Sequence, residues 1–120
     1  MTERKHRHLP VWQASMDLVE AFYLASSGFP KEEMFGLQAQ MRRAAVSVAG
    51  NIAEGAARQT RPELLQFLYI ANGSLSELDT HLEIARRLSY LENADDLQDR
   101  LNDVQGQLLA VIQSLKRRSR

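Results

Sequence analysis

The sequence predicts an all-α fold, an antiparallel up-and-down four-helix bundle, in a single domain of 120 residues. Three clusters of turn-forming residues, at 26–30, 57–62 and 90–93, divide the chain into four segments. Within each segment, apolar residues recur at intervals of three and four, which places them on one face of a helix. The period-two alternation that is typical of strands is absent. Connections of a few residues require consecutive helices to run antiparallel, and such helices pack at roughly 20°.

The four predicted helices span about 11–27, 34–57, 61–89 and 94–116, and basic tails occupy 1–8 and 116–120. Their apolar lines run from Val11 to Ala25, from Leu37 to Ile52, from Leu64 to Ala85 and from Leu97 to Leu115. We expect these lines to form the core.

The second predicted helix is distinguished by small residues between 44 and 55, which allow a neighbouring helix to approach closely. A polar stripe follows the same helix, made of Arg43, Ser47, Asn51, Glu54 and Arg58. Two interpretations are open: a solvated face, or a polar contact that fixes the register between helices or subunits. Glu54 and Arg58 have the spacing of an i,i+4 ion pair.

The third and fourth predicted helices begin with N-terminal signals. Thr60 followed by Glu63, with Pro62 in the first turn, indicates a capping box. Asn93 precedes two aspartates, which lie where the dipole of the fourth helix favours negative charge.

Charge and cysteine content narrow the functional classes. Fifteen Lys and Arg offset fifteen Asp and Glu, so a nucleic-acid-binding surface must come from where the charges lie rather than from their sum. The absence of cysteine excludes disulfides, thiolate metal sites and a thiol nucleophile. No apolar stretch reaches the roughly 20 residues that span a bilayer, and the N-terminus does not look like a secretory signal. We expect a soluble, cytoplasmic protein that does not associate with membranes.

The first and third predicted helices each carry a second line of large side chains beside the core line. The members of this second seam are Trp12, Met16, Val19, Tyr23, Phe67, Ile70, Ile84 and Leu88. One interpretation is a wide core face; the other, which we favour, is a subunit interface, because aromatic residues and Met are enriched at interface centres. A contact from the first helix of one subunit to the third helix of the next would be heterologous, and such contacts close into rings. We therefore expect a ring-shaped homo-oligomer.

Basic residues gather at one end of the predicted bundle. In an up-and-down bundle the start of helix one, the turn between helices two and three, and the end of helix four lie together. The cations expected there are Arg4, Lys5, Arg7, Arg58, Arg61, Lys116, Arg117, Arg118 and Arg120, offset by Glu3 and Glu63. This end could bind a polyanion. Alternatively, the charges complement helix dipoles and belong to solvated tails.

Catalytic chemistry is not indicated by the sequence. Apart from two histidines in the N-terminal tail, His81 is the only one, and its partner in an i,i+4 pair is Glu77. Two such groups do not make a metal site, and a hydrogen-bonded histidine is the simpler interpretation. Glycine-rich phosphate loops, a zinc-binding His-Glu-x-x-His motif and a Gly-x-Ser-x-Gly elbow are absent. We expect no enzymatic activity, no cofactor and no metal.

Several short runs resemble a known family in order and spacing. They are VWQ at 11–13, FPKEE at 29–33, FGL at 35–37, RRAA at 42–45, NIAEG at 51–55 and FLYIANGSLSEL at 67–78. These runs are similar to those of bacterial four-helix-bundle proteins that are encoded in intervening sequences of large-subunit rRNA genes and are described as ribosomal-protein-like. The motif residues that carry this resemblance best are Arg42, Arg43, Asn51, Glu54 and Gly55.

The resemblance implies homopentameric rings and, from relatives in diversity-generating retroelements, binding to nucleic acid and to a reverse transcriptase. It would make the second seam a ring interface and the basic end a nucleic-acid surface, although those relatives are markedly basic and this chain is neutral. The sequence thus predicts a non-enzymatic, oligomeric accessory protein. Its expected partner is RNA, or a reverse-transcriptase-like or ribosome-associated protein. The alternative is a protein-interaction scaffold that binds no nucleic acid.

Overall fold

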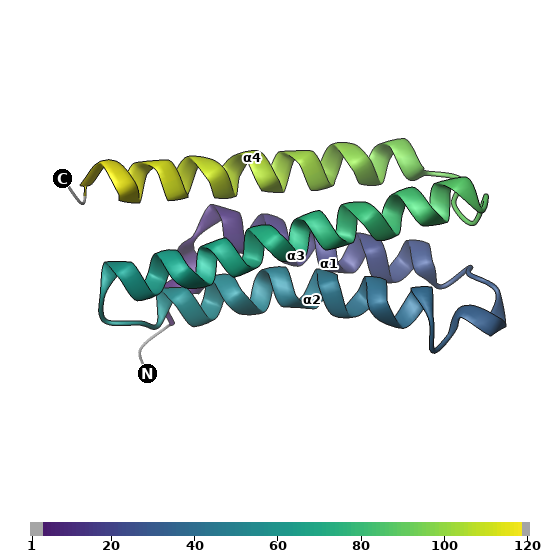
Figure 1. Cartoon of the computed structure of the whole chain (residues 1–120), viewed down its shortest axis with the longest axis horizontal. Coiled ribbons are helices and arrows are strands. Elements are labelled where there is room, and N and C mark those ends of the chain that lie inside the picture. The colour runs from purple at the N-terminus through teal and green to yellow at the C-terminus, as the bar shows by residue number, and fades with distance from the viewer. Residues whose placement is uncertain (1–3, 119–120) are drawn as a thin grey trace.

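A computed structural model describes residues 4–118 as four α-helices in an up-and-down bundle, with no strand among these residues (Figure 1). The helices are α1 (Pro10–Ser26), α2 (Leu37–Ala56), α3 (Arg61–Arg87) and α4 (Ala94–Arg118). Each helix contacts the next one along the chain, and α4 returns to contact α1. The predicted fold class is therefore confirmed.

Two boundaries differ from those predicted. The helix α2 begins at Leu37 rather than near 34, because Lys31–Glu33 forms a short 3-10 helix (η2) and a turn follows it. A carboxylate oxygen of Glu33 accepts the N–H of Leu37 at 3.1 Å and so caps α2. Parts of the two basic segments at the chain ends are helical within residues 4–118. Lys5–His8 forms a second 3-10 helix (η1), and α4 remains helical through Arg118.

Local sequence explains where α3 starts and stops. The Thr60 side chain accepts the N–H of Glu63 at 3.3 Å, as the N-cap signal predicted, and its hydroxyl lies 2.6 Å from the Glu63 carboxylate. At the other end Ser89 adopts a left-handed φ of 59°, the conformation that glycine usually supplies after a helix. The Tyr90 N–H then bonds to the Ala85 carbonyl at 3.0 Å, which closes α3 and directs the chain into α4.

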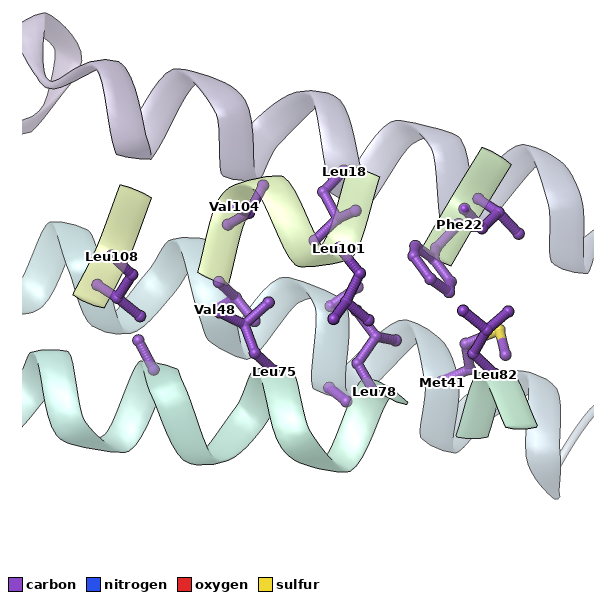
Figure 2. Close-up of a cluster of buried hydrophobic side chains, with 14 of the residues drawn as sticks. Leu18, Phe22, Met41, Val48, Leu75, Leu78, Leu82, Leu101, Val104 and Leu108 are labelled. Atoms are coloured by element: carbon purple, nitrogen blue, oxygen red, sulfur yellow. The ribbon is translucent and has the colours of Figure 1, made fainter. Parts of the chain in front are cut away.

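The core follows the predicted apolar lines through most of the bundle. Figure 2 shows its central side chains, among them Leu18, Val48 and Leu75, which are at most 1% exposed. Burial of each such leucine contributes about 1.5–3 kcal/mol. Ser15 interrupts the line on α1 but is fully buried without an unsatisfied hydroxyl, because it donates to the Val11 carbonyl at 2.7 Å.

Several residues of the predicted apolar lines are only partly buried. Ala25, at the end of α1, is one of them, and three others lie at the opposite end of the bundle. Leu64, Val111 and Leu115 belong to the predicted lines but remain half-buried. They lie at the start of α3 and the end of α4, which is the end that carries the basic residues (Figure 1).

Candidate functional site

The fold brings the predicted cations to one end of the bundle. The 3-10 helix η1, the connection between α2 and α3, and the last turn of α4 lie at the same end (Figure 1). We call this end the basic pole; its exposed members are Arg4, Lys5, Arg7, Arg58, Arg61, Lys116, Arg117 and Arg118. Arg120 and the acidic Glu3, which were expected here, lie outside the described residues.

Two of these cations are engaged by neighbouring side chains. Arg58 pairs with Glu54 at 2.8 Å, and its guanidinium lies 4.7 Å from the centre of the Phe67 ring. Arg7 lies 5.6 Å from the centre of the Trp12 ring. The i,i+4 ion pair predicted for Glu54 and Arg58 is therefore confirmed, and it adds Glu54 to the acids that offset the charge of the pole. The other members have no ion-pair partner within residues 4–118.

An apolar hollow of about 650 Å³ opens at the basic pole. Its lining comes from η1 and all four helices, and among residues 4–118 Lys5 and Arg118 are its only charged members. The half-buried Leu64, Val111 and Leu115 form part of this lining. These residues were predicted to be core, because helix periodicity does not distinguish a filled core from an open one.

The opposite end, which we call the acidic pole, contains Glu32, Glu33, Glu92, Asp95, Asp96 and Asp99. Two of these six acids form ion pairs and a third, Glu33, accepts a hydrogen bond. Arg86 binds Asp95 at 2.7 Å and Arg100 binds Asp96 at 3.1 Å. The Tyr90 hydroxyl donates to Glu33 at 3.0 Å, and this hydrogen bond raises the pKa of Tyr90 above its usual value of 10.0.

The second seam divides into buried and exposed members. Trp12 and Val19 pack against the core, and Phe67 is half-buried. The exposed members are Met16, Tyr23, Ile70, Ile84 and Leu88, each 40–50% accessible. Both lines border α2, since Arg42 of α2 lies over the Tyr23 ring of α1 at 4.5 Å and Arg58 of α2 lies over Phe67 of α3. The bundle therefore presents one apolar edge on each side of α2.

The motif residue Arg42 ties α2 to the end of α1. It donates to the Tyr23 carbonyl at 3.0 Å and to the hydroxyls of Ser26 and Ser27 at 2.9 and 3.2 Å. These contacts satisfy polar groups at the C-terminus of α1, where a positive charge also complements the helix dipole. The role of Arg42 in the monomer is thus structural, and the exposed Arg43 has no such contact within the described residues.

Two further motif residues lie where α2 meets α3. The Asn51 amide donates to the Ser47 carbonyl at 2.8 Å and to the Ser47 hydroxyl at 2.9 Å, and that hydroxyl is 2.9 Å from the hydroxyl of Ser74 in α3. A Cβ at Gly55 would lie 3.0 Å from Cβ of Phe67, so glycine is what allows the two helices to approach there. Part of the polar stripe is therefore an interhelical contact.

His81 and Glu77 do not form a metal site in the described residues. The Nε2 atom of His81 is 3.9 Å from Glu77, and no group of three or more potential ligands occurs between residues 4 and 118. His81 is buried and its Nδ1 lacks a hydrogen-bond partner among these residues. Burial lowers the pKa of His81 below 6.5, and the nearby Glu77 carboxylate only partly opposes that effect.

None of the helices in residues 4–118 is both long enough and apolar enough to cross a membrane.

Comparison with known proteins places this bundle in a family. A model of the 23S rRNA-intervening sequence protein family matches residues 7–110. The chain is also similar to a crystal structure from Bacteroides thetaiotaomicron, a protein with unknown function from the S23 ribosomal protein family. That similarity has a TM-score of 0.79 and 20% sequence identity, and it covers 85% of this chain and 97% of the other, which shows a shared fold. A search of curated proteins gives no match. Because the family model covers well over half of the sequence, the chain belongs to the 23S rRNA-intervening sequence protein family.

Proposed function

We propose that this protein is a non-enzymatic, oligomeric accessory protein that binds RNA, or an RNA-associated protein, through its basic pole. The observation that carries the proposal is the set of exposed cations at that pole without ion-pair partners between residues 4 and 118. A neutral chain with such a pole attracts a polyanion locally, and displacement of counterions from the phosphates drives binding.

Helix dipoles account for only part of the charge arrangement. Lys116, Arg117 and Arg118 occupy the last turn of α4, where basic residues are favoured. Arg61, however, is the first residue of α3, where the helix dipole disfavours positive charge. A cation that stays exposed and without an ion-pair partner at a helix N-terminus supports a role in binding an anion.

The two apolar edges beside α2 support the assembly part of the proposal. One edge contains Met16 and Tyr23 of α1, and the other contains Ile70 of α3, all exposed. Two different edges on one subunit are what a heterologous contact requires, and such contacts close into rings. In a ring the basic poles point the same way, so their potentials add.

The direct test of RNA binding is its salt dependence. Each phosphate contact should steepen the fall of log K with log salt by about 0.9 for duplex and about 0.7 for single-stranded RNA. A double variant, Arg61→Gln with Arg117→Gln, should weaken binding and make this slope shallower by one or two contacts. The matched control, Lys31→Gln with Arg43→Gln, removes two exposed cations outside the pole and should leave the slope unchanged. Undetectable or salt-independent binding would reject the proposal.

Assembly is tested by the mass of the particle, measured with and without nuclease treatment. The proposal expects an oligomer whose protein mass survives nuclease, and Met16→Glu or Ile70→Glu should dissociate it. A monomeric mass at micromolar concentration would reject the proposal that the protein forms an oligomer.

A protein-interaction scaffold is the second candidate, and the outer face of α2 favours it. Val46 is 47% exposed there, and no heavy atom lies within 4 Å of a Cβ built at Gly50. A partner helix could therefore approach α2 closely. Capture of a defined partner that survives both high salt and nuclease, and that is lost on Val46→Glu, would favour the scaffold.

A further inference from the structure

The hollow at the basic pole has the composition of a ligand site. Its volume of about 650 Å³ falls within the roughly 300–1,000 Å³ that is usual for small-molecule pockets. Val11, Ile52 and Leu68 line it and are at most 4% exposed, so they form its floor. Leu64 and Leu115 line it and are half-buried, so they form its walls. The interior is therefore aliphatic.

The charged residues of the hollow lie at its mouth. Lys5 on η1 and Arg118 in the last turn of α4 both line the hollow and are exposed to solvent. Within residues 4–118, neither has an ion-pair partner and no Asp or Glu lines the hollow. The uncharged polar members are Gln107 and Ser114. A ligand that enters here meets positive charge first and aliphatic surface beyond it.

We propose that this hollow binds a single-chain anionic amphiphile, a free aliphatic carboxylate, with its carboxylate between Lys5 and Arg118 and its alkyl chain against Ile52 and Leu68. Burial of the alkyl chain supplies affinity, and the two cations fix the orientation. The described lining residues include no aromatic ring on which a nucleobase could stack, so a nucleotide fits less well. This inference goes beyond the proposed function and does not require RNA binding.

Calorimetric titration of the full-length protein with octanoate and decanoate, below their micellar concentrations, tests the proposal. We expect one ligand per chain, with the Kd tightened about fourfold for each added CH₂. The same titrations with 1-octanol and with octyltrimethylammonium separate charge from apolarity: the alcohol should bind about tenfold more weakly and the cation not at all. No binding of either carboxylate, or equal affinity for octanoate and octanol, would overturn the proposal.

Variants locate the ligand. Ala110 lines the hollow but is exposed, so Ala110→Phe should occlude it and abolish decanoate binding without unfolding the bundle. The double variant Lys5→Gln with Arg118→Gln should weaken octanoate about tenfold and leave octanol unchanged. The matched control is Arg117→Gln, a neighbouring exposed cation that does not line the hollow, and it should bind octanoate normally. Decanoate binding that survives Ala110→Phe in a folded variant would overturn the assignment.

Two further experiments distinguish the proposed carboxylate from other ligands of the hollow. If the protein sediments with anionic phosphatidylglycerol vesicles but does not bind free decanoate, the hollow meets a membrane lipid and the proposal fails. If Ala110→Phe abolishes binding of a short oligouridine while decanoate does not bind, the hollow is a nucleotide site and the proposal also fails. Failure of RNA binding in the salt experiment leaves the carboxylate titrations unaffected, so the two proposals fail separately.

Discussion

At the acidic pole two of the six acids form ion pairs and a third accepts a hydrogen bond, whereas at the basic pole one of the eight described cations forms an ion pair. Arg86 with Asp95 and Arg100 with Asp96 are ion pairs at one end. At the other end, Arg58 with Glu54 is the ion pair found within residues 4–118. Exposed pairs of this kind add little stability, so the difference bears mainly on where charge remains available for a partner.

Packing differs between the two ends in the same sense. Phe22, Met41 and Leu82 are completely buried and lie in the half of the bundle nearer the acidic pole (Figure 2). The basic pole instead contains the apolar hollow with its half-buried lining. We therefore expect truncation of these buried side chains to cost more stability than truncation of the half-buried residues that line the hollow.

The largest expected effect tests that difference in stability. Phe22→Ala removes a fully buried ring and should lower the free energy of unfolding by about 3–5 kcal/mol. Leu115→Ala removes a half-buried side chain that already borders open space, and should lower it by only about 1 kcal/mol. Urea unfolding of both variants measures the two losses. Equal losses would show that the two ends are packed equally well.

A second pair of variants asks whether the basic pole is loose everywhere or only at the hollow. A Cβ at Gly55 would lie 3.0 Å from Cβ of Phe67 and 3.2 Å from the Leu64 carbonyl oxygen, neither of which is the end of a flexible side chain. Gly55→Ala should therefore destabilise the protein by about 1 kcal/mol net, because the strain of overpacking exceeds the gain in helix propensity.

The matched control for Gly55 is Gly50, in the same helix. No heavy atom lies within 4 Å of a Cβ built there, so Gly50→Ala should stabilise by about 0.5–1 kcal/mol. Thermal unfolding distinguishes the opposite signs. If Gly55→Ala also stabilises, α2 and α3 are not in close contact at this pole.

Much of the fold could be predicted because helix periodicity and short connections leave few alternatives. The apolar lines identified Leu18, Val48 and Leu75 as core, and the Thr60 signal marked the start of α3. The turn after α3 was predicted, but its left-handed residue, Ser89, carries no glycine signal. The start of α2 was missed because the Glu33 cap depends on a side-chain conformation that only the folded loop defines.

The candidate site could be predicted in position but not in detail. Topology alone gathers the ends of the chain and the central turn, so the basic pole followed from the order of the helices. The ion pair of Arg58 with Glu54 followed from their i,i+4 spacing, whereas the contact of Arg58 with the Phe67 ring depends on side-chain rotamers that the spacing does not define. The hollow could not be foreseen either, because Val111 continues the apolar line of α4 without interruption, yet its neighbour Ile112 is the residue that is buried and Val111 lines the hollow.

Acid sensitivity is a smaller effect that sharpens the comparison, since His81 is buried while the histidines near the basic pole are not. Its pKa is lowered by burial, so below about pH 6.5 the unfolded chain binds a proton more readily than the folded one. Above about pH 6.5, His81 therefore does not lower the free energy of unfolding. As the pH falls below that value, protonation of this one group lowers the free energy of unfolding by at most about 1.4 kcal/mol per pH unit.

His81→Leu should remove this part of the pH dependence and also eliminate the unpartnered Nδ1. Glu77→Gln should steepen the dependence, because the carboxylate that opposes the lowered pKa is lost. Urea unfolding across the acidic range compares the three proteins. Parallel pH profiles for the wild type and His81→Leu would contradict the assignment.

The smallest effect concerns the hydrogen bond from Tyr90 to Glu33, which joins the α3–α4 turn to the loop before α2 at the acidic pole. Tyr90→Phe keeps the ring beside Phe29, whose centre is 5.3 Å away, and removes only the hydroxyl. We expect a decrease in stability smaller than that of Gly55→Ala, because the bond is partly exposed.

The same hydrogen bond predicts a pH dependence at alkaline pH. Because the folded state favours the neutral phenol of Tyr90, the stability that this bond contributes is fully present below pH 10.0 and is lost as the pH rises above it. Ultraviolet titration of tyrosinate should show one group titrating late, absent in Tyr90→Phe and closer to normal in Glu33→Gln. If Tyr90 titrates normally, its hydroxyl does not bond to Glu33, and the ion pairs alone connect side chains at the acidic pole. The difference between the two poles in the number of paired charged side chains would then be smaller.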